Sequence, residues 1–348
     1  MRYPRPLEKG QTIGFAAPSF GASIEPYISL FDEALSNFES LGYKVLLGPN
    51  CREGKGIGIS NTPEKCGAEL TDMYTRKDCD ILISVGGGEC MCETISHVDF
   101  EKVKDADPKW YMGYSDNTHF TFLLNTLCDT AAIYGPHASE FGMRPWHPAV
   151  NDALAVLSGR KHVENYDLWE IDQLKCADDP YAGYNCTEKS TLRIFKGGSI
   201  YPMGSNGCSA KFSGRIVGGC MDVLLGLCGT RFDNVKEFIE KYKEDGIIWF
   251  LESCDLSPMD FRRGLWRLKE AGWFENTKAF IFGRPMHFGE DFIGVTFESA
   301  TIDMLKDLNV PMILDADIGH LPPMMPIISG SYANVSFDDK LKIDYEFI

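Results

Sequence analysis

The sequence predicts an α/β protein, in which an N-terminal doubly wound parallel-sheet domain is followed by a C-terminal α/β domain. Three observations predict this fold class. Short apolar runs alternate along the chain with segments in which apolar residues recur at helical spacing. Glycine, proline and small polar residues follow the apolar runs, as they do where strands end. The length of 348 residues is too great for one small core and suggests two domains of roughly 150 residues each.

The N-terminal half shows the alternation clearly. Expected strands run over residues 11–17, 44–47, 80–85, 110–112 and 132–134, and expected helices over residues 25–41, 63–74, 119–127 and 151–157. Strands that alternate with helices imply a parallel sheet with helices on both faces. Ligands bind beyond the carboxyl ends of the strands in such sheets. The Ala17-Pro18-Ser19 turn, the Gly86-Gly87-Gly88 run and Ser115 are all expected at that edge.

We place the first domain at residues 1–160, and the composition and periodicity of the sequence change after it. Residues 161–213 lack a helical period, are rich in Asp, Tyr, Gly, Lys and Ser, and are interpreted as a linker entering the second domain, with short strands near residues 191–195. The second domain spans residues 214–348 and alternates again. Expected strands run over residues 214–218, 246–251, 278–282 and 311–314, expected helices over 220–227, 235–242, 258–271 and 297–308, and a closing hairpin over 333–337 and 341–345.

The formal net charge of −16 argues against a polyanionic partner, because nucleic acid and anionic membrane surfaces would be repelled overall. Hydrophobic residues make up 44% and charged residues 24% of the chain, as in ordinary globular proteins. The first residues lack an apolar signal core, and no run is long enough to span a bilayer. We therefore expect a cytoplasmic protein with no nucleic-acid or membrane partner.

The sequence gives no support for a cofactor or a metal. The twelve cysteines are scattered through apolar segments and are interpreted as reduced, buried thiols. Cys90-Met91-Cys92 with His97 nearby does not match the Cys-x-x-Cys spacing of zinc sites, and no second pair follows. The Gly86-Gly87-Gly88 run matches neither a dinucleotide-binding fingerprint nor a phosphate-binding loop. It still permits close backbone approach and can direct N–H groups at an anion.

Ser115 is the candidate nucleophile. It follows the expected strand 110–112 and Gly113, and precedes the expected helix 119–127. A sharp strand-to-helix turn exposes the serine hydroxyl at the carboxyl edge of the sheet and leaves N–H groups available at the helix start. A hydroxyl placed there can attack a carbonyl while those N–H groups hold the oxyanion. The alternative interpretation is that Ser115 only caps the helix.

A serine nucleophile needs a base, and the base needs an orienting partner. Of the seven histidines, His320 is the best placed, because it follows a strand and begins a stiff proline-rich loop. His137, at a strand end of the first domain, is the rival base and otherwise a pocket residue. Glu252 ends a strongly apolar strand. Burying a carboxylate there costs free energy unless the carboxylate is paired. Asp315 and Asp317 are alternative orienting carboxylates.

Taken together, these segments resemble the serine LD-carboxypeptidases, a family that includes muramoyl-tetrapeptide carboxypeptidases and microcin C self-immunity peptidases. The resemblance rests on six segments in the family's order: residues 10–19, Gly86-Gly87-Gly88, Gly113-Tyr114-Ser115-Asp116, residues 218–230, Phe250-Leu251-Glu252, and Gly319-His320 with Pro323 and Pro326. It implies that the second domain is of the swivelling type and that the active site lies in the cleft between the domains. It also implies a Ser115–His320–Glu252 triad, an oxyanion hole from the N–H of Asp116 and of Gly87 or Gly88, and a homodimer.

The substrate is left open between two classes that the resemblance implies. One is a murein tetrapeptide that loses its terminal D-alanine during peptidoglycan recycling, and the other is an aminoacyl-nucleotide antibiotic of the microcin C type. The glycine loop, Ser84 to Cys90, and Gly218-Gly219-Cys220 both depart from the pattern of the peptidoglycan-type members, and the insert at residues 166–184 is similar to the immunity branch. Arg144 is a candidate for gripping the substrate carboxylate, because a guanidinium suits bidentate carboxylate binding.

Two further hypotheses come from other classes. The first is a two-domain protein that binds a small molecule without chemistry, because a fold does not fix a function. The second is a glutamine-amidotransferase-like enzyme with a cysteine nucleophile. We rank this one low, because no cysteine lies at a Gly-x-Cys-x-Gly turn.

Overall fold

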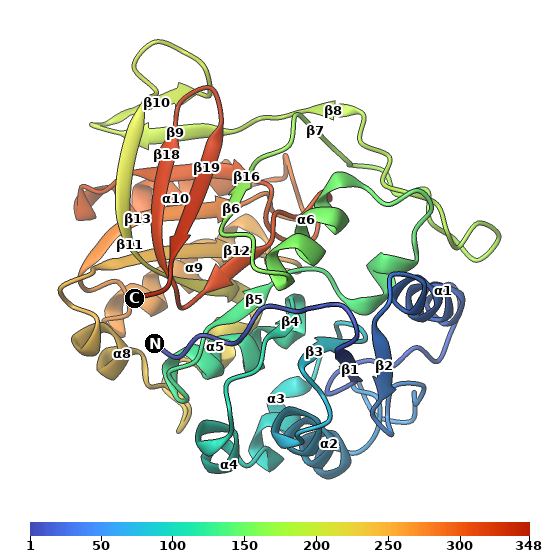
Figure 1. Ribbon diagram of the computed structural model, residues 1–348. Helices are drawn as coiled ribbons and strands as arrows, with labels where there is room; N and C mark the ends of the chain where they lie inside the picture. Colours follow the sequence, from blue (N-terminus) through green and yellow to red (C-terminus); the bar gives the residue numbers. More distant parts are fainter. The chain divides into compact units, whose positions relative to one another are not determined.

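The computed structural model describes residues 1–348, and the chain divides into two compact units. Unit 1 comprises Met1–Arg160, Asp172–Asn185 and Pro326–Ser329. Unit 2 comprises Lys161–Ile171, Cys186–Met325 and Gly330–Ile348. Each unit has its own sheet, so the chain is a mixed α/β protein with two domains, as the sequence predicts (Figure 1).

Unit 1 is built on a six-stranded sheet with the order β17-β5-β4-β3-β1-β2. Its strands are β1 (Thr12–Ala16), β2 (Lys44–Leu47), β3 (Ile81–Ser84), β4 (Tyr111–Gly113), β5 (Ala132–Tyr134) and β17 (Ile327–Ser329). The first five are parallel, and β17 adds to β5 in the antiparallel sense. Their carboxyl ends therefore meet at one edge, to which β1, β3 and β4 deliver the Ala17–Ser19 turn, the glycine run and Ser115.

Helices connect and cover the strands of unit 1. They are α1 (Tyr27–Ser40), α2 (Pro63–Thr75), α3 (Met91–Thr94), α4 (Phe100–Asp105), α5 (Thr118–Thr126) and α6 (Pro148–Leu157), with the short 3-10 helices η1 (Ile95–His97), η2 (Ser115–Asn117) and η3 (Ala138–Gly142). The apolar face of α1 buries Phe31 and Phe38 against Phe15 of β1, with ring centroids 5.5 and 5.8 Å from that of Phe15. Burial of these rings ties α1 to the sheet.

Unit 2 contains a nine-stranded sheet with the order β10-β9-β16-β13-β12-β11-β18-β19-β6. Its strands are β6 (His162–Glu164), β9 (Arg193–Lys196), β10 (Ser199–Pro202), β11 (Ala210–Cys220), β12 (Ile247–Glu252), β13 (Thr277–Gly283), β16 (Met312–Ala316), β18 (Tyr332–Phe337) and β19 (Leu341–Glu346). The central four, β11, β12, β13 and β16, are parallel. Every residue of β12 is buried, as expected for a central parallel strand.

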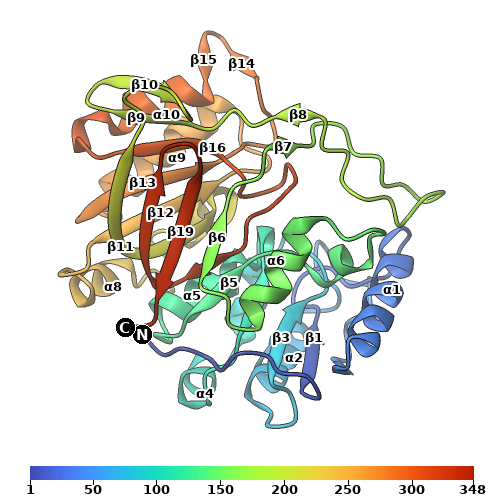
Figure 2. The same cartoon turned by 45° about the horizontal axis from the view of Figure 1, so that its top comes forward.

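The helices of unit 2 pack around this sheet. They are α7 (Met221–Leu227), α8 (Val235–Lys241), α9 (Pro258–Glu270) and α10 (Phe297–Leu305), followed by η4 (Lys306–Leu308). Two small ribbons stand outside the sheet: β7 (Leu168–Trp169) pairs with β8 (Glu188–Lys189), and β14 (Asp291–Phe292) pairs with β15 (Val295–Thr296) (Figure 2). Thr296 caps α10 by accepting a hydrogen bond from the N–H of Ser299, 3.2 Å away.

Most of the predicted elements are present, usually within two or three residues of the expected bounds. The segment interpreted as a linker, residues 161–213, supplies β9 to the sheet of unit 2, close to the short strands expected near residues 191–195, and it also supplies β6 and β10, which were not expected. These are short strands at or near its edges and lack the alternation that a longer strand would show. Likewise β17, a strand of three residues directly after the proline-rich loop, returns the chain to the sheet of unit 1. No helix in the structure combines the length and the apolar character needed to cross a bilayer.

Candidate active site

Ser115 occupies the turn between β4 and α5. Its backbone φ of 59° lies in the left-handed region, which non-glycine residues seldom adopt and which is associated with strained functional turns. The N–H of Ser115 donates to the phenol oxygen of Tyr134 at the end of β5, over 3.3 Å. A left-handed backbone at this position fits a sharp nucleophile turn, whereas an ordinary helix cap is extended.

The carboxylate of Asp116 ties this turn to its neighbours. Its Oδ2 accepts hydrogen bonds from the hydroxyl of Ser19 at 2.6 Å and from the N–H of Met91 at 3.0 Å. Its Oδ1 lies 3.1 Å from Nδ1 of His119. Asp116 is buried, so these contacts are shielded from water. One side chain thus fixes the turn after β1 and the segment after the glycine run relative to Ser115.

Asn117 and His137 pack against the turn that contains Ser115. The amide of Asn117 donates to the carbonyl of Gly86 at 2.8 Å and lies 3.3 Å from Nε2 of His137. Nε2 of His137 is also 3.0 Å from the carbonyl oxygen of Tyr114, and the His137 ring stacks on the Tyr114 ring with centroids 4.3 Å apart. Within unit 1, His137 is thus a buried neighbour of the nucleophile turn, held by backbone and ring contacts.

The glycine run lies directly against Ser115. A Cβ added at Gly87 would stand 3.4 Å from Oγ of Ser115, which places the Gly87 backbone beside the hydroxyl. Gly88 has a φ of 157°, and a Cβ there would stand 2.0 Å from Oγ of Ser19. Only glycine fits at this position. The Gly87 backbone and the N-terminal turn that begins at Ser115 therefore both lie beside the Ser115 hydroxyl.

Arg144 is already engaged within unit 1. Its Nε donates to Oε1 of Glu33 at 2.8 Å, and its Nη2 also contacts the Glu33 carboxylate. The guanidinium lies over the ring of Tyr181, 4.3 Å from the centroid. The fork of Arg144 therefore holds a carboxylate of the protein itself, in the bidentate manner that the sequence argument expected toward a substrate.

In unit 2, the carboxylate of Glu252 pairs with His320. Glu252 ends β12 and is 1% exposed. Its Oε2 lies 2.9 Å from Nδ1 of His320, which directs Nε2 of the imidazole away from the carboxylate. Burial by itself lowers the pKa of His320, but the charge and hydrogen bond of Glu252, together with the Cys254 thiol, raise this pKa well above its ordinary value. The pair has the geometry of a base and its orienting acid.

The other two acidic candidates have different partners. Asp317 forms a fully buried ion pair with Arg284, with 2.5 Å between Oδ1 and Nη2, and its carbonyl accepts from the N–H of Met325 at 2.7 Å. Asp315 lies 3.1 Å from Nη2 of Arg193. Asp317 therefore braces the loop that carries His320 rather than contacting the imidazole itself.

Sequence reasoning did not identify the groups that hold these loops. Besides Asp317, they include Asp222, whose carboxylate accepts from the N–H of Cys254 at 3.1 Å and of Asp255 at 2.9 Å. Asp222 lies in the first turn of α7, and the loop that it holds follows Glu252 directly. An acidic residue in the first turn of a helix is commonplace, so its spacing alone carries no signal.

Gly319 makes room for the Glu252–His320 contact, and its replacement is a test of that geometry. A Cβ at Gly319, where φ is 107°, would stand 2.5 Å from Oε2 of Glu252. We expect Gly319→Ala to lower activity about 100-fold by displacing the carboxylate or the imidazole, and to destabilise unit 2 by about 1–3 kcal/mol. Activity assays and urea unfolding measure the two effects.

Gly294→Ala is the matched control for this variant. Gly294 also has a positive φ, of 83°, but a Cβ there would meet no atom within 4 Å. It should therefore show the backbone cost without the loss of activity. Equal activity of the two variants would contradict the steric role assigned to Gly319.

Comparison with known proteins places this arrangement in a family. Residues 13–135 match the LD-carboxypeptidase N-terminal domain and residues 213–335 match the LD-carboxypeptidase C-terminal domain. A putative carboxypeptidase of Vibrio cholerae is 26% identical over 97% of this chain and 96% of its own length. The microcin C7 self-immunity protein MccF of Escherichia coli is 26% identical over 96% of this chain and 93% of its own length.

Solved structures agree with these matches in fold. An MccF-like protein from Bacillus anthracis has a TM-score of 0.81 at 22% identity, covering 99% of this chain and 100% of its own. MccF in complex with aspartyl sulfamoyl adenosine has a TM-score of 0.79 at 20% identity, covering 99% of this chain and 98% of its own. With both domain matches in the expected order and covering more than half of the sequence, the chain belongs to the LD-carboxypeptidase family.

Proposed function

We propose that this protein is a serine peptidase that hydrolyses an amide bond next to a free carboxylate, with Ser115 as nucleophile, His320 as base and Glu252 as the group that orients the base. The observation that carries the proposal is the buried 2.9 Å contact between Nδ1 of His320 and Oε2 of Glu252. A carboxylate in that position fixes the tautomer of the imidazole and stabilises its charged form. The left-handed backbone of Ser115 supports the choice of nucleophile.

The proposed reaction proceeds in two stages. Oγ of Ser115 attacks the amide carbonyl and gives its proton to Nε2 of His320, while N–H groups of Asp116 and of Gly87 or Gly88 hold the oxyanion. The C–N bond then breaks, and the imidazolium returns the proton to the leaving amine. Water, deprotonated by His320, attacks the acyl-enzyme and releases the second product and the free hydroxyl. Glu252 stays ionised and compensates the imidazolium in both stages.

The leading substrate is a murein tetrapeptide that loses its terminal D-alanine. The alternative is an aminoacyl-nucleotide of the microcin C type. MccF and the Vibrio carboxypeptidase are equally similar in sequence and so do not separate the two classes. The glycine loop and Gly218-Gly219-Cys220 depart from the peptidoglycan-type pattern, which favours the alternative. Structures of MccF contain aspartyl sulfamoyl adenosine and glutamyl sulfamoyl guanosine. His137 and Arg144 remain our candidates for substrate contacts.

A side-by-side assay tests both substrates on one preparation. An L,D-tetrapeptide and aspartyl- or glutamyl-sulfamoyl adenosine are supplied separately, and released D-alanine and released amino acid are quantified. Turnover of either substrate supports a peptidase and identifies its class. A fluorophosphonate probe covers the remaining hypothesis: covalent labelling at Ser115 supports the enzyme, whereas no labelling together with no turnover of either substrate would favour a protein that only binds a small molecule.

A further inference from the structure

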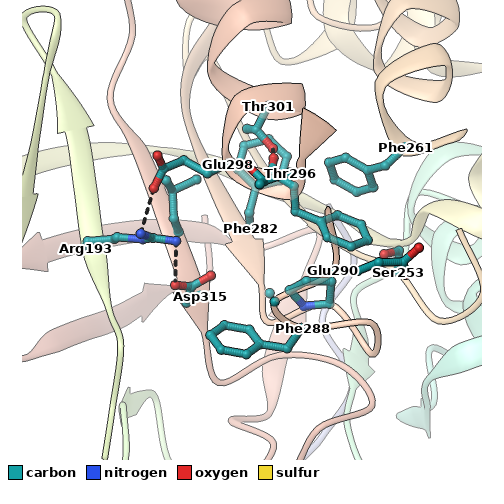
Figure 3. A pocket seen from close by; sticks show the side chains of 15 residues that line it. Arg193, Ser253, Phe261, Phe282, Phe288, Glu290, Thr296, Glu298, Thr301 and Asp315 are labelled. Carbon is teal, nitrogen blue, oxygen red and sulfur yellow. Dashed lines mark hydrogen bonds and ion pairs between the residues drawn. The ribbon is translucent and has the colours of Figure 1, made fainter. Parts of the chain in front are cut away.

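Glu69 is a buried acidic residue that the proposed reaction does not use. It lies in the middle of α2, and it is 3% exposed. In unit 2 the buried carboxylates of Asp315 and Asp317 face guanidinium groups, as Figure 3 shows for Asp315 and Arg193. Glu69 has no such cation, and its hydrogen-bond partners are all N–H groups. Only those groups compensate the burial of its charge.

The Glu69 carboxylate joins the ends of two neighbouring strands. Its Oε2 accepts from the N–H of Ala17, directly after β1, and from the side-chain amide of Asn50, both at 3.2 Å. Its Oε1 accepts from the backbone N–H of Asn50, three residues after β2, at 2.9 Å. Gly48 leaves the space for this contact, because a Cβ there would stand 2.2 Å from Oε1. Both oxygens must therefore accept, as they do in an ionised carboxylate.

The N–H of Ala17 begins the turn after β1, Ala17–Phe20, and this turn contacts two segments of the proposed oxyanion hole. The hydroxyl of Ser19 donates to Oδ2 of Asp116 at 2.6 Å. The N–H of Phe20 donates to the carbonyl of Gly87, also at 2.6 Å. The position of the turn therefore sets where the backbones of residues 87 and 116 lie, and Glu69 holds the first residue of the turn.

The charge of Glu69 changes in the physiological pH range. Burial raises the pKa of Glu69 to about 7, although the N–H groups of Asn50 and Ala17 act to lower it. Protonation places a hydrogen on one of the two oxygens, and that hydrogen then meets an N–H donor. The neutral acid cannot hold both strand ends as the carboxylate does.

The groups around Glu69 do not titrate in the same range. Those that face it are the Cys51 and Cys66 thiols and the Tyr111 phenol, on the loop after β2, on α2 and on β4. Burial raises the pKa of all three, so they stay neutral near pH 7. The other helices packed on α2 carry their titratable groups at the surface, namely Cys92 and Glu93 of α3, His97 of η1 and the charged side chains of α4.

We propose that Glu69 is a positioning residue for the oxyanion hole, because its ionised carboxylate holds the turn after β1 where Ser19 reaches Asp116 and Phe20 reaches Gly87. This role rests on the proposed function, since it concerns the N–H groups that are assigned there to the oxyanion. Glu69 touches neither the substrate nor Ser115 in this role. It acts through the turn alone.

Glu69→Gln keeps the shape of the side chain but places an NH₂ group against one of the N–H donors, as protonation does. Ser60 and Thr94 also hold the turn through hydrogen bonds to its carbonyl groups, so we expect a displaced turn in a folded protein. At pH 8, kcat on the preferred substrate should fall about 10- to 100-fold, with KM changed by less than about threefold, because the loss concerns the transition state. The ratio of wild-type to variant kcat/KM should decline as the pH falls through about 7. The ionisation of His320 cancels in this ratio.

Stability should change in the opposite sense, which separates positioning from a merely structural role. A carboxyl group whose pKa is raised on folding contributes stabilisation that is fully present below its unfolded value, about 4.3. That contribution is lost as the pH rises through the folded value of about 7. As the pH rises to about 7, the wild type should therefore lose stability relative to Glu69→Gln in urea unfolding while it gains activity relative to that variant. An activity ratio that is independent of pH, or that follows stability, would overturn the role of Glu69.

Two further variants test specificity and route. Glu64→Gln makes the same substitution on the exposed side of α2, where a backbone N–H lowers the pKa of Glu64, so its activity relative to the wild type should not vary near pH 7. Ser19→Ala removes the contact with Asp116. The loss in Ser19→Ala/Glu69→Gln should be smaller than the product of the two single losses, because both act on one turn. A loss equal to that product would mean that Glu69 does not act through the turn.

The amide signals of Ala17 and Asn50 give a measurement that needs no substrate. In NMR spectra of the wild type, both backbone N–H signals should titrate with a shared midpoint near pH 7, and neither should do so in Glu69→Gln. Absence of that midpoint in the wild type would overturn the role of Glu69. A wild type that neither turns over substrate nor reacts with fluorophosphonate would remove the proposed function and this role with it. An active wild type whose activity ratio to Glu69→Gln is independent of pH would remove the role of Glu69 alone.

Discussion

Replacement of Ser115 by alanine should lower kcat/KM on the preferred substrate by on the order of 10⁴- to 10⁶-fold, because it removes the only atom that forms the acyl-enzyme in the proposed mechanism. Fluorophosphonate labelling should disappear in the same variant. The unfolding transition in urea should change little, since the left-handed backbone at residue 115 is equally unfavourable for serine and for alanine. Turnover and labelling are measured on the same preparations.

Two companion variants make this result specific. Ser115→Gly should be as inactive as Ser115→Ala but more stable than it by about 1 kcal/mol, because glycine adopts a φ of 59° without strain. The double variant Ser115→Ala/His320→Ala should be no less active than Ser115→Ala alone, because the two residues act on one proton transfer. Additive losses in the double variant, or substantial turnover without the hydroxyl, would remove Ser115 from the mechanism.

The parts of the fold that follow from local pattern were predictable. β12 is five apolar residues and a glutamate, and a fully buried parallel strand is the arrangement that tolerates such a run. Gly113 and Ser115 are separated by one residue, and the turn between β4 and α5 follows from that spacing. Strands such as β17 and β6 were not predictable in the same way, because three residues carry too little periodicity, and their pairing partners lie far away in the sequence.

The candidate site could also be predicted from the sequence only in part. Glu252 and His320 could be nominated because each ends an apolar strand or follows one, where a polar side chain is unexpected. Which carboxylate meets His320 could not be deduced from the sequence, since Asp315 and Asp317 are nearer along the chain. The structure separates them through their cationic partners: Arg193 contacts Asp315, and Arg284, buried inside unit 2, contacts Asp317. The role of a side chain without a local motif, such as Asp222, can be recognised only from its contacts in the folded structure.

The second large effect concerns pH and the charge of Glu252. A base accepts a proton only in its neutral form, so kcat/KM should rise with pH through the pKa of His320 in the free enzyme. Because the Glu252 carboxylate raises this pKa well above the ordinary value, the acid limb of the wild-type profile should lie on the alkaline side of that of an isolated histidine. Glu252→Gln keeps a hydrogen-bond acceptor beside Nδ1 and loses the charge.

In Glu252→Gln we therefore expect the acid limb to move to lower pH, because the charge of Glu252 no longer raises the pKa of His320, whereas burial still lowers it. The plateau of kcat should fall on the order of 10²- to 10⁴-fold, since the imidazolium loses its compensating charge. Asp255→Asn, three residues along the chain and exposed, removes a carboxylate without touching His320 and should leave the acid limb unshifted. An acid limb that moves equally in both variants would reflect general electrostatics rather than this pair.

The same linkage fixes how stability should depend on pH. A histidine whose pKa is raised on folding contributes stabilisation that is fully present below the pKa of the unfolded chain, about 6.5. That contribution is lost as the pH rises through the raised pKa of His320 in the folded protein. The excess stability of the wild type over Glu252→Gln should therefore shrink in urea unfolding as the pH rises above about 6.5. An excess that grew with pH would mean that His320 is neutral in the folded protein and that Glu252 does not hold its charge.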